Sequence, residues 1–394
     1  MTTRIDSAER RRRLGVRHAL AAPVARPEEV AERVVALHST DPAAMALGVC
    51  ARLAIPSIAE LERALYEDRT LVRVLAMRRT VFAVPADLAA SCLSATARSV
   101  AVPERRKLLT MLADSGIAEP EDFLARAHAA ARAAMPGLGQ FRSADLGAAD
   151  PLLATRIDIG AGTRYATRQS IASRLLTLMS AEGHVVRAKP AGSWASTQFT
   201  WCAAETWIPG LAERPDPAEA AREIARRWLA AYGPAPLEDL CWWTGWTKGT
   251  ARAALDGLDL ADVETDTGPA LALADDLEPT PDPGPWVALL PALDSTTMGW
   301  KRRAWYLGDH AGRVFDDVGN AGPTVWADGR IVGGWTIRDD GTVAYRILDD
   351  IGAEQRAAVG HRAAELEDLL GGTVVKARAR RWTSLEKELR DRSE

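Results

Sequence analysis

The stretch from Val34 to Leu53, VVALHSTDPAAMALGVCARL, places polar and titratable side chains between two apolar runs. The polar residues are His38, Ser39 and Thr40, and Asp41 follows them. A neutral imidazole can accept a proton near neutral pH, and a hydroxyl beside it can hold the same water molecule. This break in core-like sequence is therefore suited to acid–base chemistry. The alternative is that the polar residues only cap helices, and the sequence leaves both interpretations open.

Local signals indicate how these residues are positioned. Asp41 followed by Pro42 and two alanines is typical of a helix start, with the cap at Asp41 and proline at the first helical position. We expect one helix to run into His38 and a second helix to cover residues 42–53. The polar residues would then lie at the seam between two helices, near free backbone N–H groups.

Composition limits the class of protein. The chain has 394 residues, enough for two or three domains, and its apolar fraction of 47% is that of a globular protein. Its charged N-terminus and the lack of a long uncharged apolar window indicate neither a secretory signal nor a membrane span. The cysteines lie far apart without metal-ligand spacing, so we expect reduced core residues in a cytoplasmic protein, and no metal or cofactor. They are Cys50, Cys92, Cys202 and Cys241.

Charge is unevenly distributed along the chain. The net charge of −4 does not by itself indicate a nucleic-acid-binding protein. Local basic patches matter more than the total for steering a protein toward phosphates, although such patches alone carry little weight. The basic clusters are Arg10–Arg13, Arg105–Lys107, Lys301–Arg303 and Lys376–Arg381, and residues 256–282 are acidic.

Residues 1–100 have the element order of a winged helix-turn-helix. Helices are predicted over residues 5–20, 42–53 and 57–66, and residues 71–85 have the pattern of a strand pair with basic residues inserted. Helices followed by a short strand pair are typical of this motif. We therefore predict a first winged-helix unit that carries the His-Ser-Thr motif.

The same order recurs in residues 101–210. Helices are predicted over residues 122–135, 142–146 and 167–176, and a strand, a polar turn and a second strand over residues 184–201. A helix rich in Ser, Thr and Arg before a basic hairpin is suited to place the helix in a DNA groove and the hairpin on the backbone. The alternative is an ordinary surface hairpin.

A third copy of this order occupies residues 211–280. Its helices are predicted over residues 217–232, 236–243 and 247–255, and a hairpin over residues 263–273 follows. The hairpin is acidic and would repel phosphate, so we expect this winged-helix unit to be structural rather than DNA-contacting.

A Pro-rich segment at residues 278–286 then marks a boundary, and the apolar period changes to two in residues 285–394. These residues predict a β-barrel-like domain that closes with a helix and a basic tail. Its expected elements are strands at 287–290 and 303–307, hairpin turns at Asp328-Gly329 and Asp340-Gly341, and a helix at 353–370. The fold class is mainly α with β (α+β), with tandem winged helix-turn-helix motifs plus this C-terminal domain.

Three segments together resemble one family, the AlkZ/YcaQ-like winged-helix DNA glycosylases. Residues 37–53, LHSTDPAAMALGVCARL, stand where that family has Leu-Gln-x-Gln-Asp-Pro and an alanine-rich helix ending in Ala-Arg-Leu. Residues 69–85, RTLVRVLAMRRTVFAVP, are similar to its Arg-Thr-Leu-Val-Arg…Met-Arg-Gly-Thr-Leu-His-Leu-Val-Pro block. Residues 289–303 and 323–335 are similar to its Leu-Pro-x-Phe-Asp and Val-Asp-Gly-x-Val-x-Gly-x-Trp segments. The resemblance implies the winged-helix architecture and glycosidic-bond hydrolysis on alkylated double-stranded DNA.

The chain departs from the family at the catalytic pair. His38 and Thr40 stand where the family has Gln-x-Gln or Gln-x-Asp, and Phe82 stands at the histidine of its Thr-Leu-His. An N7-alkylated guanine is already a cationic leaving group, so catalysis needs a positioned water and stabilisation of an oxocarbenium-like sugar. Neutral His38 could place that water and accept its proton, Thr40 could hold it, and Asp41 could orient the imidazole or offset the sugar's charge. We expect these three to be catalytic.

Further residues are expected around the DNA. No lysine lies near the His-Ser-Thr motif, so a Schiff-base lyase step is not expected, and the predicted enzyme is a monomer without a cofactor. Ser39 and Asp294 are expected to line the cleft. The expected DNA-binding residues are Arg78, Arg79, Arg164, Arg168, Gln169, Arg174, Lys189, Lys301, Arg302 and Arg303.

Two alternatives keep part of this interpretation. The first is a non-catalytic winged-helix protein that binds DNA or regulates transcription and has lost the Gln-x-Gln site. The second is a scaffold or small-molecule-sequestering protein without DNA contact, for which duplex binding would show no salt dependence.

Overall fold

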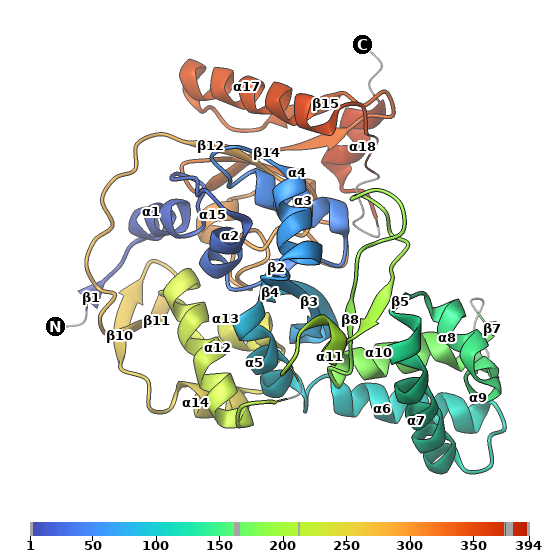
Figure 1. The fold of residues 1–394 in the computed structure, drawn as a ribbon. Helices are drawn as coiled ribbons and strands as arrows, with labels where there is room; N and C mark the ends of the chain where they lie inside the picture. Colours follow the sequence, from blue (N-terminus) through green and yellow to red (C-terminus); the bar gives the residue numbers. More distant parts are fainter. Residues whose placement is uncertain (1–2, 161–165, 212, 374, 376–380, 392–394) are drawn as a thin grey trace. The chain divides into compact units, whose positions relative to one another are not determined.

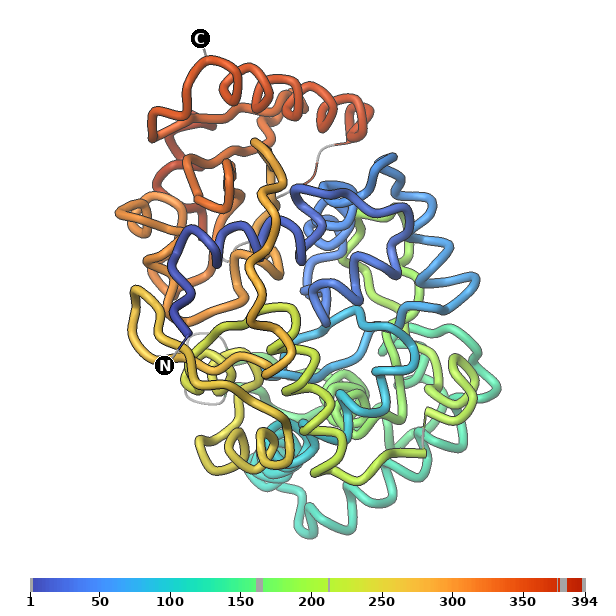
Figure 2. The backbone as a smooth tube through the Cα atoms, turned by 90° about the vertical axis from the view of Figure 1, so that its left-hand side faces the viewer, coloured from blue at the N-terminus to red at the C-terminus, as the bar shows by residue number. Residues whose placement is uncertain are grey.

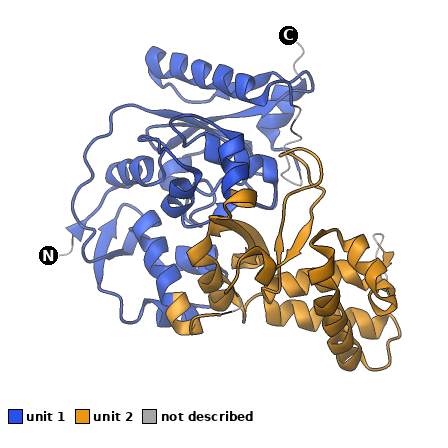
Figure 3. Cartoon of the chain, viewed as in Figure 1, with its two compact units in different colours: residues 1–64, 222–394 blue, residues 65–221 orange. Residues whose placement is uncertain are grey.

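The computed structural model describes residues 3–160, 166–211, 213–373, 375 and 381–391. The chain forms two compact units (Figure 3). Unit 1 contains residues 1–64 and 222–394, and unit 2 contains residues 65–221. Helices alternate with small sheets along the whole chain (Figure 1), which confirms the α+β class.

The N-terminal part of unit 1 is a group of short helices around one short strand. Helix α2 ends at Arg33, and Val35 has a left-handed backbone with φ of 64°, so the predicted continuation of this helix to His38 is wrong. The chain reaches the His-Ser-Thr motif in an extended conformation. The elements are α1 (Ser7–Arg17), α2 (Pro27–Arg33), β2 (Leu37–His38), α3 (Pro42–Cys50) and α4 (Ile58–Glu62).

Unit 2 begins with an antiparallel hairpin. Strands β3 (Leu71–Ala76) and β4 (Thr80–Pro85) pair from Leu71 opposite Pro85 to Ala76 opposite Thr80, which confirms the predicted strand pair. Every residue of β3 is buried. Helix α5 (Ala86–Thr96) follows directly and packs on β3.

The rest of unit 2 repeats the helices-then-hairpin order around one hydrophobic core. Helix α10 begins only at Ile171, because the Ser170 side chain caps it by accepting from the N–H of Ala172. Thr167–Ser170 instead form strand β7, so the predicted helix over 167–176 starts too early. The elements are α6 (Ala101–Asp114), α7 (Pro120–Leu138), β5 (Gln140–Phe141), α8 (Ser143–Ala149), α9 (Pro151–Ala154), β6 (Arg156–Ile159), β7, α10 (Ile171–Ala181), β8 (Val185–Arg187), β9 (Trp201–Ala203) and α11 (Ala204–Trp207).

Residues 211–280 contain the predicted order of helices followed by a hairpin. Strands β10 and β11 form the expected hairpin, and β1 (Thr3–Arg4) adds a parallel edge strand to β10. The elements are α12 (Pro217–Tyr232), α13 (Leu237–Thr244), α14 (Lys248–Leu255), β10 (Leu260–Thr265) and β11 (Gly268–Leu273).

The C-terminal part of unit 1 is a four-stranded antiparallel sheet in the order β12-β13-β14-β15. Both predicted Asp-Gly turns are present, and Asp328 and Gly329 adopt the positive φ values that a tight hairpin requires. Helix α17 packs along β12 and β15 (Figure 1), and α18 packs on β14. The strands are β12 (Val287–Leu290), β13 (Thr324–Ala327), β14 (Arg330–Ile337) and β15 (Val343–Ile347), and the helices are α17 (Gly352–Leu370) and α18 (Ser384–Asp391).

Two features of this region differ from a simple barrel-like pattern. Among the described residues the sheet is open, with β12 and β15 at its edges and a bulge between Val325 and Trp326. Residues 303–307, predicted as a strand, form the one-turn helix α15 (Ala304–Leu307), and α16 (Ala311–Val314) follows. Five residues are too few for an apolar run to distinguish a strand from a buried helical turn.

The Pro-rich segment at residues 278–286 runs beside helix α1 (Figure 2) and is hydrogen-bonded to it. Arg13 donates to the Glu278 carbonyl at 3.0 Å, and Glu9 accepts from the N–H of Thr280 at 2.8 Å. Arg13 is only 1% exposed, so this part of the predicted basic cluster Arg10–Arg13 is an internal brace.

No helix in the described part of the chain combines the length and apolar character needed to cross a membrane. The division of the sequence into three winged-helix units stays a prediction, because the first and the third of them each span a point at which the two compact units separate.

Candidate active site

Exposure alternates along the His-Ser-Thr motif. His38 is partly exposed at the end of β2, Ser39 is fully buried, and Thr40 is exposed. Asp41 also has an extended backbone, with φ of −104° and ψ of 114°. His38 and Thr40 are therefore the two members of the motif that reach the surface. The structure therefore leaves the two predicted catalytic side chains accessible and buries Ser39, a predicted cleft residue.

Asp41 caps helix α3. Its Oδ1 accepts hydrogen bonds from the N–H of Ala43 at 2.9 Å and of Ala44 at 3.4 Å, and Pro42 occupies the first helical position. The predicted cap is confirmed.

Removing this cap gives a stability prediction. Asp41→Ala is expected to lower the free energy of unfolding by about 1 kcal/mol, because two backbone N–H groups lose their acceptor. Asp41→Asn is the matched control and should remain within about 0.5 kcal/mol of the wild type, since asparagine caps as well as aspartate. Urea unfolding measures both variants, and an equal loss in the two would contradict the cap as the source of the effect.

The main chain before His38 is anchored by Ser295. The His38 N–H donates to Ser295 Oγ at 3.1 Å, and the same hydroxyl donates to the Ala36 carbonyl at 2.9 Å. The Tyr232 hydroxyl donates to the Val34 carbonyl at 3.0 Å. Two segments far away in the sequence therefore fix the backbone that presents His38.

Ser295 is held in turn by a buried ion pair. Arg52 and Asp294 form a bidentate pair, with Nη2–Oδ1 at 2.7 Å and Nη1–Oδ2 at 2.9 Å. Their side chains are 0% and 4% exposed. Arg52 also donates to the His18 carbonyl at 3.0 Å and to Thr296 Oγ1 at 2.7 Å. The structure thus places Asp294 in a buried network beside Ser295, and its predicted place on the cleft wall stays untested.

His18 completes this network. Its Nε2 lies 3.1 Å from the Ala231 carbonyl, which can only accept, so Nδ1 accepts from the Thr296 hydroxyl at 2.8 Å. The ring stacks on Trp300 and meets Tyr232 edge-on. Complete burial, with the Arg52 charge adding to it, lowers the pKa of His18 to about 3. The residue is therefore a neutral part of the core.

This lowered pKa predicts acid sensitivity. The folded pKa lies below the ordinary value of 6.5, so protons favour the unfolded state, and stability is lost as the pH falls from about 6.5 toward 3. The loss is expected to reach about 2 kcal/mol at pH 5, at about 1.4 kcal/mol per pH unit. His18→Gln, which does not titrate, should lose that much less between pH 7 and pH 5 in urea unfolding. Parallel pH dependences would contradict the assignment.

Two of the predicted DNA-binding residues lie at the β3–β4 turn of unit 2. Arg78 and Arg79 adopt left-handed backbones, with φ of 53° and 59°. The Arg79 side chain is 45% exposed and pairs with Glu104, with Nη2–Oε2 at 3.0 Å. Arg79 is thus engaged in an ion pair within unit 2, and DNA binding by either arginine stays a prediction.

The other predicted contacts in unit 2 lie on separate elements. Arg168 and Gln169 are exposed on strand β7 rather than on a helix, and Arg168 lies 3.7 Å from Asp158. Arg174 is on α10, and Lys189 is exposed after β8, its Nζ 5.9 Å from the ring centre of Tyr66. Arg164 lies outside the described residues.

The basic cluster Lys301–Arg303 of unit 1 is partly neutralised within the protein. Lys301 Nζ lies 2.5 Å from Glu238, and Arg302 makes a second ion pair with the same carboxylate at 3.0 Å. Arg303 covers the rings of Trp242 and Phe315. Whether these residues bind DNA stays a prediction.

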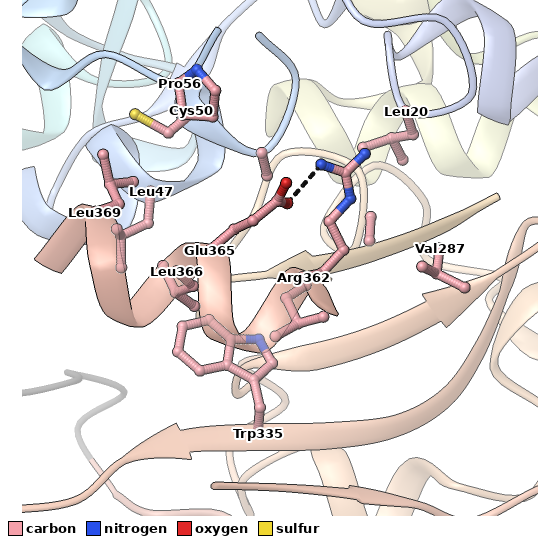
Figure 4. A pocket seen from close by; sticks show the side chains of 13 residues that line it. Leu20, Leu47, Cys50, Pro56, Val287, Trp335, Arg362, Glu365, Leu366 and Leu369 are labelled. Carbon is pink, nitrogen blue, oxygen red and sulfur yellow. Dashed lines mark hydrogen bonds and ion pairs between the residues drawn. The ribbon is translucent and has the colours of Figure 1, made fainter. Parts of the chain in front are cut away.

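A small pocket also lies beside α3, lined mainly by apolar side chains of α3, β12 and α17 (Figure 4). Its volume of about 60 Å³ is far below the roughly 300–1,000 Å³ of sites that hold drug-sized ligands. Burial raises the pKa of the Cys50 thiol at its wall to about 11, so this cysteine stays protonated. The pocket is therefore a packing gap between α17 and α3.

The sequence analysis did not identify the residues that hold the backbone of the His-Ser-Thr motif in place. Arg52, Thr296, Ser295 and His18 were not singled out, although Arg52 is a lone charge at the end of an apolar run and is therefore a detectable signal. The ion pair joins residues 37–53 to residues 289–303, two of the segments that carried the family resemblance.

The chain is similar to known DNA glycosylases in sequence and in fold. A family model described as "DNA glycosylase AlkZ-like" matches residues 31–369. The structure is similar to that of Streptomyces sahachiroi DNA glycosylase AlkZ, with a TM-score of 0.73, 20% identity, and coverage of 95% of this chain and 100% of that one. A curated relative from the same organism, "Interstrand DNA cross-link repair glycosylase", is 30% identical over 145 residues. That alignment spans 34% of this chain and 39% of the relative.

Proposed function

Because the chain belongs to the AlkZ-like DNA glycosylase family, we propose that it hydrolyses the N-glycosidic bond of alkylated purine nucleotides in double-stranded DNA. The observation that carries this proposal is the shared exposure of His38 and Thr40 on a backbone braced by Ser295. The family match supports the class of reaction, and the residues define how this chain would perform it.

The proposed substrate carries an adduct on N7 of the purine. Alkylation there makes the base a cationic leaving group, so the bond between C1′ and N9 can break without an acid to protonate the base. Water adds its oxygen to C1′, and the bonding pair leaves with the purine and neutralises its charge. The catalyst must then place the water and stabilise the oxocarbenium-like sugar.

His38 supplies the base in this scheme. Its neutral imidazole accepts the proton of the attacking water, and Thr40 holds the same water. Asp41 offsets positive charge on the sugar or orients His38, beside its role as a helix cap. Since no lysine lies between Val34 and Leu53, the proposed reaction is hydrolysis without a lyase step.

Asp294 acts indirectly in this proposal. Its carboxylate is committed to Arg52, so it positions Ser295 and through it the His38 backbone. Bulky or crosslinked N7 adducts are included in the proposed substrate range, because the curated relative is described as an interstrand cross-link repair glycosylase. We propose that the enzyme acts as a monomer on DNA in the bacterial cytoplasm.

Single-turnover excision from a labelled duplex tests the function. The wild-type protein is expected to release N7-methylguanine and then a bulky N7 adduct, leaving abasic sites that alkaline workup cleaves. Unmodified duplex is the control for nonspecific cleavage. Salt-dependent binding of the adducted duplex without release of either base would overturn the catalytic proposal and favour the non-catalytic DNA-binding alternative.

A further inference from the structure

Unit 2 contains a cluster of two histidines and one glutamate away from the proposed active-site residues. His128, Glu182 and His184 each offer one ligand atom, and these atoms all lie within 4.8 Å of one another. His128 Nε2 lies 3.0 Å from Glu182 Oε2, and the two imidazole rings meet edge-on with centres 5.0 Å apart. All three side chains are partly buried rather than solvated.

Local folding brings these side chains together from separate elements. His128 lies in the middle of helix α7, and Glu182 is the C-cap of α10. Gly183 has φ of 72° and lies against Leu93 and Arg214, so glycine is needed for the tight turn between Glu182 and His184. The turn ends α10 and leads directly into β8, with His184 at the junction.

Two imidazole nitrogens and a carboxylate oxygen form a donor set that suits zinc and related divalent transition metals. In such a site, Zn–N and Zn–O bonds of about 2.0–2.2 Å place neighbouring donors a little more than 3 Å apart. The His128–Glu182 pair already has this spacing. We propose that His128, Glu182 and His184 bind a divalent transition metal ion of the Zn²⁺ type.

The surroundings determine the strength and geometry of such a site. A pocket of about 410 Å³ adjoins His184 and is also lined by Arg132 and Glu205, which leaves room for water at a fourth coordination position. Arg105 lies 3.7 Å from the other Glu182 oxygen, and Arg214 donates to the Glu182 carbonyl. These guanidinium charges disfavour hard cations that rely on charge alone, so we expect selection of imidazole-binding metals over Mg²⁺ and Ca²⁺.

The bound ion would be structural. It links α7 to the turn between α10 and β8, and thereby fixes the base of the β8–β9 hairpin within unit 2. The inference depends on these three residues and not on the proposed glycosylase reaction, so either can fail without the other.

Metal titration of the full-length, chelator-treated protein tests the site. Zn²⁺ is expected to bind with one-to-one stoichiometry against a competing chromophoric chelator, and Co²⁺ should give the visible absorption of a low-symmetry nitrogen and oxygen site. The double variant His128→Ala/His184→Ala should bind Zn²⁺ more than about 100-fold more weakly, since even outer-shell partners contribute about 10–100-fold. His361→Ala is the control, because His361 is exposed on α17, where its Nε2 lies 3.2 Å from Glu365 and outside the cluster.

Thermal unfolding provides an independent measurement that does not need a variant. Zn²⁺ at 100 times its Kd is expected to raise the Tm of the wild-type protein by about 5–10 °C. Mg²⁺ at the same concentration should leave the Tm unchanged. Absence of stoichiometric Zn²⁺ binding, or equal affinity in the wild type and the double variant, would overturn the proposal and leave the cluster as an ion-pair network.

Discussion

Replacing His38 by alanine is expected to slow single-turnover excision of N7-methylguanine by about 10²–10⁴-fold, the contribution of a positioned general base. The fold should persist, because His38 is partly exposed and its backbone N–H, not its imidazole, makes the bond to Ser295. Equal circular dichroism spectra and equal duplex affinity would show that only the chemical step has changed.

His38→Gln separates proton transfer from water placement. Glutamine is the residue that the resembling family has at this position, and it can place water without accepting a proton. We expect this variant to excise faster than His38→Ala and slower than the wild type. Its rate should also lack the fall at acidic pH that protonation of a catalytic imidazole causes. A His38→Ala variant with the wild-type rate would exclude His38 as the base.

The sequence predicted those elements whose signals are local. The cap at Asp41 and the hairpin turns at Asp328-Gly329 and Asp340-Gly341 depend on neighbouring residues, and all are present. The predicted boundaries of helices were wrong where the local sequence pattern does not determine where a helix begins or ends. Helix α2 stops early at the left-handed backbone of Val35, and Thr167–Ser170 pair with β6 instead of extending α10.

For the same reason, the sequence predicted the candidate catalytic residues but not the residues that position them. His38 and Thr40 stand out as polar residues within an apolar run, but the Arg52–Asp294 ion pair joins positions 242 residues apart. No single-sequence pattern links charges at such a distance. The burial of charged side chains is equally difficult to predict from the sequence. Arg10 and Arg13 have the pattern of a basic surface patch that steers toward phosphates, but they are only 4% and 1% exposed in the fold.

Arg52→Met is expected to be the most destabilising of the substitutions considered for this network. It leaves the Asp294 carboxylate buried without its partner, which typically costs about 3–5 kcal/mol. For a unit of this size the Tm should fall by about 6–20 °C. Arg126→Met is the matched control, because Arg126 pairs with Asp122 on the surface with both side chains about 60% exposed, and it should cost less than about 1 kcal/mol.

The double variant Arg52→Met/Asp294→Leu distinguishes an unpaired charge from lost packing. It should recover part of the stability lost by Arg52→Met, because neither buried charge remains. Recovery is expected to be incomplete, since the carbonyls of His18 and Gly48 lose the donor that Arg52 provides. Calorimetry of the single and double variants measures this coupling, and additive losses would contradict a shared network.

Excision by the same double variant then tests what the network does for the reaction. Ser295 follows Asp294 directly and accepts a hydrogen bond from the His38 N–H. Loss of the Arg52–Asp294 ion pair should therefore make the position of His38 less well defined without removing its imidazole. We expect a slower chemical step with unchanged duplex affinity in protein that is still folded. If the folded double variant excises the base at the wild-type rate, Arg52 and Asp294 stabilise unit 1 but do not position His38.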